Sequence, residues 1–166
     1  MFSQRALFIY GLVLCVALMA TALYFQYVME LEPCPLCAIQ RLLVIAVGVV
    51  MLVGAVHDPA GFGRKVYGVL TLIPAVLGVV VAGRHVWLQN LPPDEVPACG
   101  PGLNYLMDTL PFNEMLEEVF RGSGECAEVQ WQFLGLTIPG WTLVIFIAMV
   151  AFAIYLVATR RPATTG

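Results

Sequence analysis

The sequence predicts an all-α membrane protein, folded as a bundle of four transmembrane helices with two loops on its outer side. Hydrophobic residues make up 60% of the chain and charged residues only 11%, whereas soluble domains are roughly 45–50% apolar and about 25% charged. The apolar residues also gather in four runs, each close to the roughly 20 residues that a helix needs to cross a bilayer. The composition therefore excludes an ordinary soluble domain, and no basic patch indicates a nucleic-acid partner.

The four runs define a single transmembrane domain over residues 1–166. The predicted spans cover residues 6–28, 39–56, 66–86 and 141–158. The segments between them are a short outer loop, about 29–38, a cytoplasmic loop around 57–65 and a long outer loop, about 87–140.

The first span also has a second interpretation. Arg5, the apolar stretch after it and the tripeptide ATA at 20–22 are compatible with a cleavable signal peptide. The apolar character continues to Val28, further than a signal peptide normally requires, which favours a retained helix. Cleavage would leave the outer loops on the same side of the membrane.

Positive charges predict the orientation, because Lys and Arg beside the spans resist translocation. Five such residues flank the ends of the spans on one side: Arg5, Arg64, Lys65, Arg160 and Arg161. This side should be cytoplasmic, so both termini are expected inside. In a bacterial inner membrane the two outer loops would then face the periplasm.

Four of the five cysteines, Cys34, Cys37, Cys99 and Cys126, fall in the two predicted outer loops. Because the periplasm is oxidising, cysteines placed there are plausible disulfide partners. Cys15 lies inside the first span, where a free cysteine packs as a small apolar side chain.

The segment CPLC begins the second span. Pro35 is well suited to the first helical position, so Cys34 should be the N-cap and Cys37 should lie in the first turn. The positive end of the helix dipole and Arg41, one turn further on the same face, would both stabilise a thiolate at Cys37. A guanidinium inside the start of a span is costly and marks a functional site by default. The alternative is that Arg41 is an anchor that reaches the lipid headgroups.

The long loop contains a helical pattern of its own. In PFNEMLEEVFRGSG, residues 111–124, apolar side chains recur at helical spacing and glutamates occupy the other face. This pattern predicts a short amphipathic helix on the membrane surface. A helix that covers the end of the bundle is the alternative. The Pro- and Gly-rich segment before it contains Cys99 and should be extended.

Four motifs, in this order, resemble the disulfide bond formation protein B family. They are CPLCAIQR at the head of the second span, RHVWLQ at the end of the third, Cys99 in the long loop, and GECAEVQWQFLGL before the fourth. Members of this family are four-helix inner membrane oxidoreductases that pass electrons from a periplasmic thioredoxin-like disulfide oxidase to quinone. The resemblance covers nearly the whole chain.

The resemblance implies a role for each site residue. Cys34 and Cys37 would be the pair that faces the quinone, which would be either ubiquinone or menaquinone, and Cys37 would be nearest to the quinone ring. Arg41 would stabilise the negative charge that develops on quinone or thiolate. Cys99 and Cys126 would be the pair that exchanges with the soluble partner.

Two further residues, His85 and Gln89, match positions that family members place near the quinone. An alternative for His85 is an interfacial histidine bonded to water or to a carbonyl.

Two other functions stay open at this stage. Four-helix relatives of vitamin K epoxide reductase also reduce quinones, but they carry the quinone-facing Cys-x-x-Cys on a late helix. A structural zinc site could instead use all four loop cysteines. The 26 residues between Cys99 and Cys126 do not fit the paired Cys-x-x-Cys knuckles that are usual in such sites.

Overall fold

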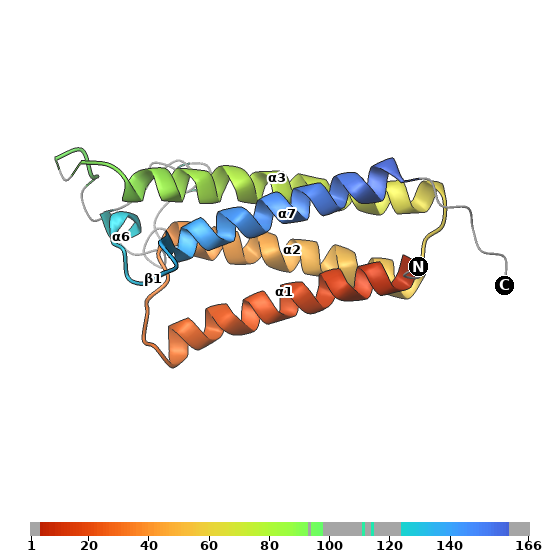
Figure 1. Cartoon of the computed structure of the whole chain (residues 1–166), viewed down its shortest axis with the longest axis horizontal. Coiled ribbons are helices and arrows are strands. Elements are labelled where there is room, and N and C mark those ends of the chain that lie inside the picture. Colours follow the sequence, from red (N-terminus) through yellow and green to blue (C-terminus); the bar gives the residue numbers. More distant parts are fainter. Residues whose placement is uncertain (1–3, 93, 98–110, 112–113, 115–123, 160–166) are drawn as a thin grey trace.

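The computed structural model describes residues 4–92, 94–97, 111, 114 and 124–159. Four long helices run side by side and account for most of this part of the chain (Figure 1). They are α1 (Gln4–Tyr27), α2 (Pro35–His57), α3 (Phe62–Gln89) and α7 (Ile138–Ala158). Each is long and apolar enough to cross a membrane. The predicted four-helix membrane bundle is confirmed.

Most helix ends lie outside the apolar runs that predicted them, although α1 ends at Tyr27, one residue before the end of its predicted span. α3 begins at Phe62 and ends at Gln89, three to four residues outside the predicted span at each end, and α7 begins at Ile138. At the start of α7, the Thr137 side chain accepts a hydrogen bond from the backbone N–H of Gly140, and Pro139 occupies the first turn. Capping and backbone hydrogen bonding therefore set the helix ends, whereas hydropathy detects only the segment inside the lipid.

Small residues allow the helices to pack closely. A Cβ atom on Gly78 of α3 would lie 2.2 Å from the ring of Phe146 on α7, and one on Gly54 of α2 would lie 2.6 Å from the ring of Phe8 on α1. Such close approaches are typical of helix pairs in membranes. Cys15 is buried in this core, as predicted for a small apolar side chain.

The packing of the four helices is uneven. α3 packs mainly against α7 and α2, whereas α1 packs mainly against α2. Between α1 and α7 the bundle is therefore less tightly closed, and the larger of the two cavities described below lies on this side.

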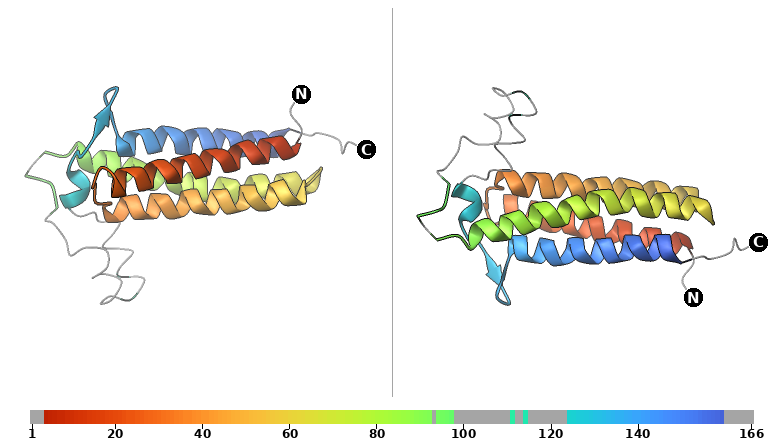
Figure 2. Two further views of the ribbon diagram at one scale, coloured as in Figure 1. Left: turned by 90° about the horizontal axis from the view of Figure 1, so that it is seen from below. Right: turned by 90° about the horizontal axis from the view of Figure 1, so that it is seen from above.

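Different elements lie at the two ends of the bundle. The start of α1, the end of α7 and the α2–α3 connection lie at one end (Figures 1 and 2). The short helix α6 (Gly124–Ala127) and the strands β1 (Gln132–Phe133) and β2 (Leu136–Thr137) lie at the other end. The start of α2, with Cys34 and Cys37, is at this second end, together with the last turns of α3.

The hairpin formed by β1 and β2 was not predicted. Gln132 pairs with Thr137 and Phe133 with Leu136, so Leu134 and Gly135 form a two-residue turn, both with positive φ (53° and 81°). Leucine rarely adopts this conformation, and the usual sequence signal for such a turn is Asn-Gly or Asp-Gly. The sequence therefore gave no indication of a hairpin here.

Two predictions fall outside the described residues. Residues 112–113 and 115–123 hold nearly all of the predicted amphipathic helix, and Cys99 belongs to the undescribed stretch 98–110. Both stay predictions.

Candidate functional site

The CPLC segment adopts the predicted geometry. Cys34 has an extended backbone (φ −67°, ψ 163°) at the N-cap of α2, Pro35 is the first helical residue, and Cys37 lies in the first turn. The sulfur of Cys34 donates a hydrogen bond to the sulfur of Cys37 over 3.2 Å. The two thiols are therefore direct neighbours at the end of a membrane-spanning helix.

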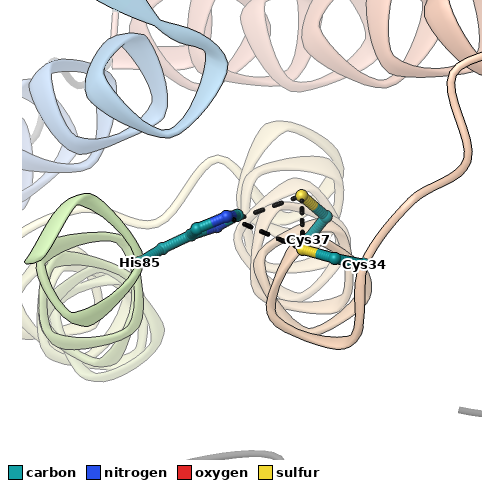
Figure 3. A group of neighbouring side chains, drawn as sticks. All are labelled: Cys34, Cys37 and His85. Atoms are coloured by element: carbon teal, nitrogen blue, oxygen red, sulfur yellow. Dashed lines mark hydrogen bonds between the residues drawn. The ribbon is translucent and has the colours of Figure 1, made fainter. Parts of the chain in front are cut away.

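His85, on the last turns of α3, faces this pair. Its side chain is only 2% exposed. Its Nε2 atom lies 3.7 Å from Sγ of Cys34, and its Nδ1 atom lies 4.0 Å from Sγ of Cys37. Figure 3 shows the imidazole edge directed from α3 toward both sulfurs on α2. The imidazole of His85 therefore lies beside both sulfurs of the CPLC segment.

Two residues that sequence reasoning missed hold the imidazole of His85. Nε2 of Gln40, a side chain only 4% exposed, lies 3.2 Å from Nδ1 of His85. Thr142 on α7 donates a hydrogen bond over 2.6 Å to Oε1 of Gln40. With the amide in this orientation, Nδ1 accepts, so a neutral imidazole carries its proton on Nε2, facing Cys34. The available signal was a glutamine three residues after Cys37 in an apolar helix.

A third cysteine lies behind the pair. Cys126, on α6, is 1% exposed and packs with Cys34, Leu36 and Leu88. Two effects raise the pKa of the Cys126 thiol above its ordinary value: a hydrogen bond with Cys34, which is the larger effect, and burial. Cys126 is therefore a protonated thiol at neutral pH, next to Cys34. Its predicted partner, Cys99, is outside the described residues.

A large cavity opens on the other side of the pair, between α1, α2 and α7. Its volume of about 410 Å³ is within the usual range of small-molecule sites. Most of its wall is apolar, with Leu18, Phe25, Trp131 and Phe146 among the lining residues. Three residues in the first two turns of α2 supply polar groups to it: Cys37, Gln40 and Arg41.

Arg41 is bound to α1. Its Nη2 atom donates to the carbonyl oxygen of Ala22 over 3.1 Å, and its Nη1 atom donates to Oε1 of Gln26. The guanidinium therefore links α2 to α1 at the wall of the large cavity.

A small cavity of about 30 Å³ lies against Cys34, Cys37 and His85. Gln89 also borders it and joins the neighbouring elements: its Oε1 accepts from Thr137 Oγ1 over 2.7 Å, and its Nε2 donates to the carbonyl of Glu128 over 3.4 Å. His85 and Gln89 line this small cavity, whereas the residues around the large cavity include neither.

Together these features define a class of protein: a membrane-spanning helical bundle with a dithiol, a buried histidine and a further cysteine at one end. Comparison with known protein families identifies the family within this class. The family model described as "Disulfide bond formation protein DsbB" matches residues 4–156. The chain belongs to this family, whose members are thiol-disulfide oxidoreductases that act in disulfide bond formation.

Individual relatives agree with this assignment. A disulfide bond formation protein B of Nitrosococcus oceani is 59% identical over 145 residues, which is 87% of this chain and 86% of the relative. One of Saccharophagus degradans is 50% identical over 154 residues, 93% of this chain and 92% of the relative. The similarity thus extends over the full bundle.

Proposed function

We propose that this protein re-oxidises a periplasmic thioredoxin-like disulfide oxidase by relaying electrons through two cysteine pairs to membrane quinone, which generates disulfides de novo. One observation carries the proposal. The sulfur of Cys37 borders an apolar cavity of about 410 Å³ beside the guanidinium of Arg41. A thiol placed this way can be reached by a lipid-soluble electron acceptor.

The residues around the large cavity fit a quinone. The wall is mainly apolar, as a hydrophobic ring and tail require, and it is built partly by α1 and α7, whose outer faces would meet lipid. Cys37, Gln40 and Arg41 are among its polar groups, and a few such groups orient the ligand in sites of this kind. A bound quinone would supply an acceptor for two electrons and two protons.

The side chains around the inner pair have distinct roles in this proposal. Cys37 presents its sulfur to the large cavity, and Arg41 stabilises negative charge there. Nε2–H of His85 faces the sulfur of Cys34, where it can stabilise a thiolate as the disulfide with Cys37 is broken or formed. Oxidation of the two thiols to one disulfide releases two electrons and two protons.

The outer pair begins the relay. A dithiol of the partner reduces a Cys99–Cys126 disulfide and becomes a disulfide itself, so two electrons enter the enzyme. The thiol of Cys126, next to Cys34, then exchanges with the Cys34–Cys37 disulfide. This exchange restores the outer disulfide and leaves Cys34 and Cys37 reduced.

The proposed location is the bacterial inner membrane, with both termini cytoplasmic and the active cysteines periplasmic. The arrangement of the bundle supports it: the start of α1, the end of α7 and the basic pair Arg64 and Lys65 are at one end, and Cys34, Cys37 and Cys126 are at the other. Positive residues favour the cytoplasmic side.

The alternatives have less support. Membership of the disulfide bond formation family disfavours the assignment to vitamin K epoxide reductase relatives. The four-cysteine zinc site requires Cys99, which is outside the described residues. Among the described residues, the cluster of possible metal ligands consists of Cys34, Cys37 and His85, which differs from a set of four cysteines.

Quinone titrations of the purified enzyme, with reduced partner as electron donor, test the proposal. Arg41→Met should lower kcat/KM for quinone by roughly ten- to hundredfold, because a hydrogen bond to a charged group contributes about 1.5–3 kcal/mol. Arg41→Lys should fall between Arg41→Met and the unmutated enzyme, because it keeps the charge but loses the planar fork. Cys15→Ser, a buried thiol in α1, is the control and should have no effect. An unchanged kcat/KM in Arg41→Met would remove Arg41 from the proposal.

A further inference from the structure

Cys34, Cys37 and His85 offer three ligand atoms that all lie within 4.8 Å of one another (Figure 3). The two sulfurs are 3.2 Å apart, and Nε2 of His85 is 3.7 Å from Sγ of Cys34. Around a tetrahedral Zn²⁺, bond lengths of about 2.3 Å to sulfur and 2.0–2.1 Å to nitrogen place neighbouring ligand atoms about 3.5–3.8 Å apart. To fill three corners of a tetrahedron, the two sulfurs would have to separate by about half an ångström, and the imidazole, whose Nδ1 is 4.0 Å from Sγ of Cys37, would have to turn so that Nε2 also approaches this sulfur.

We propose that the dithiol form of this protein binds one soft divalent cation, of which Zn²⁺ is representative, through the two sulfurs and Nε2 of His85. Water completes the coordination. Thiolate and imidazole are the ligands that such ions prefer. This site differs from a structural four-cysteine site, because it uses a histidine and exists only while Cys34 and Cys37 are reduced.

The small cavity provides room and access for the ion. It borders all three ligands and has a volume of about 30 Å³, whereas one water molecule needs about 10–15 Å³. Glu125 and Glu128, both exposed, also border it. Their carboxylates raise the local concentration of cations at the opening.

Charge balance favours the ion at this buried position. Binding converts two thiols into two thiolates, releases two protons and leaves a complex of Zn²⁺, two thiolates and neutral histidine with no net charge. No electron is transferred. A neutral complex avoids the large cost of burying an unpaired charge. The proton of His85 must move to Nδ1, and the amide of Gln40 must turn so that its oxygen accepts it, the usual outer-shell arrangement of a metal-bound histidine.

A disulfide between Cys34 and Cys37 offers no thiolate, so oxidation and metal binding exclude each other. The ion would hold the pair reduced and stop electron flow to quinone. This effect on turnover rests on the proposed function, whereas the binding site rests on geometry alone.

Binding of Co²⁺ to the full-length protein, reduced and purified in detergent, tests the site. We expect one ion per chain, with thiolate charge-transfer absorption and the visible bands of tetrahedral Co²⁺, both lost when Zn²⁺ displaces it. Cys37→Ser should abolish the charge-transfer band or weaken binding at least tenfold, and His85→Asn should weaken binding at least tenfold. Cys15→Ser and Cys126→Ser should bind as the unmutated protein does.

The outer-shell step has its own test. Gln40→Glu offers a carboxylate that accepts the Nδ1 proton and should tighten Co²⁺ binding by about tenfold or more, and Gln40→Leu should weaken it by a similar factor. The metal site is wrong if the protein oxidised at Cys34 and Cys37 binds Co²⁺ equally well, or if binding survives His85→Asn but is lost in Cys126→Ser. Absent Co²⁺ binding with intact quinone reduction would overturn the site alone. Intact Co²⁺ binding without quinone reduction would overturn the proposed function alone.

Discussion

The sulfurs of Cys34 and Cys37 are 3.2 Å apart, yet they face different surroundings. Cys34 is 7% exposed, packs with Cys126 and borders the small cavity but not the large one. Cys37 is more exposed, borders both cavities and shares the large one with Arg41. A Cys-x-x-Cys at the start of a membrane-spanning helix can thus direct one sulfur to a protein thiol and the other to an apolar cavity.

The elements that pack around the pair create this difference. α6 and the last turns of α3 cover Cys34, which places a cysteine and a histidine against it. α1 and α7 stand apart beside Cys37, which leaves the large cavity open there. In an isolated helix the two thiols would differ only in their position relative to the helix N-terminus, and neither would have a cavity or a third cysteine beside it.

The largest expected effect comes from removing either sulfur. Cys34→Ser and Cys37→Ser should each lower quinone-dependent turnover by about 10³-fold or more, as loss of a nucleophile does. The variant Cys37→Ser keeps Cys34, the sulfur beside Cys126, and should accumulate a Cys34–Cys126 disulfide. The variant Cys34→Ser should not form the corresponding Cys37–Cys126 disulfide as readily. Mass mapping of the unreduced variants would detect it. A Cys37–Cys126 link in Cys34→Ser, formed as readily, would mean that the two sulfurs are interchangeable.

A second test concerns which outer sulfur the partner attacks. Cys126 is only 1% exposed, and Cys99 lies in VPACGPG, a segment expected to be extended and accessible to a thioredoxin-like groove. A partner that retains only its nucleophilic cysteine should therefore be trapped on Cys99. Peptide mapping of the adduct identifies the sulfur, and a bond to Cys126 would reverse the assignment.

The raised pKa of Cys126 predicts that this thiol is alkylated slowly in the fully reduced protein. A higher pKa lowers the thiolate fraction at a given pH, about tenfold for each pKa unit, and burial slows access further. Iodoacetamide at pH 8 should therefore modify Cys37 well before Cys126, and the rate at Cys126 should still be rising above pH 9. Cys34→Ala removes the hydrogen bond that is the main cause of the shift and should accelerate alkylation of Cys126. Equal rates at Cys37 and Cys126 would contradict this environment.

The sequence predicted the parts of this site that depend on neighbours along the chain. Pro35 after Cys34 and the apolar run after it were enough to place Cys34 at the N-cap and Cys37 in the first turn. Hydropathy located the four helices because each must cross lipid by itself. The Leu134–Gly135 turn was missed because its residues are not those that usually signal a hairpin.

The sequence could not predict contacts between distant segments. Gln40 and Thr142 are 102 positions apart and meet only because α2 and α7 pack together. Similarly, the motif around Gln89 associates it with His85, but the side chain of Gln89 binds Thr137 and Glu128. Which cavity a residue faces depends on such packing.

The smallest expected effect concerns Gln40, which orients the imidazole beside Cys34. Gln40→Leu removes the partner of Nδ1, so His85 should populate both neutral tautomers instead of one. Loss of an outer hydrogen bond of this kind should lower turnover by about tenfold. The ring ¹⁵N chemical shifts of His85 report the tautomer directly and would be insensitive to a purely structural role. Thr142→Val, which leaves the amide of Gln40 in place but removes its support, should shift the tautomer ratio in the same direction by less. Unchanged ¹⁵N shifts in Gln40→Leu would show that Gln40 does not set the tautomer of His85.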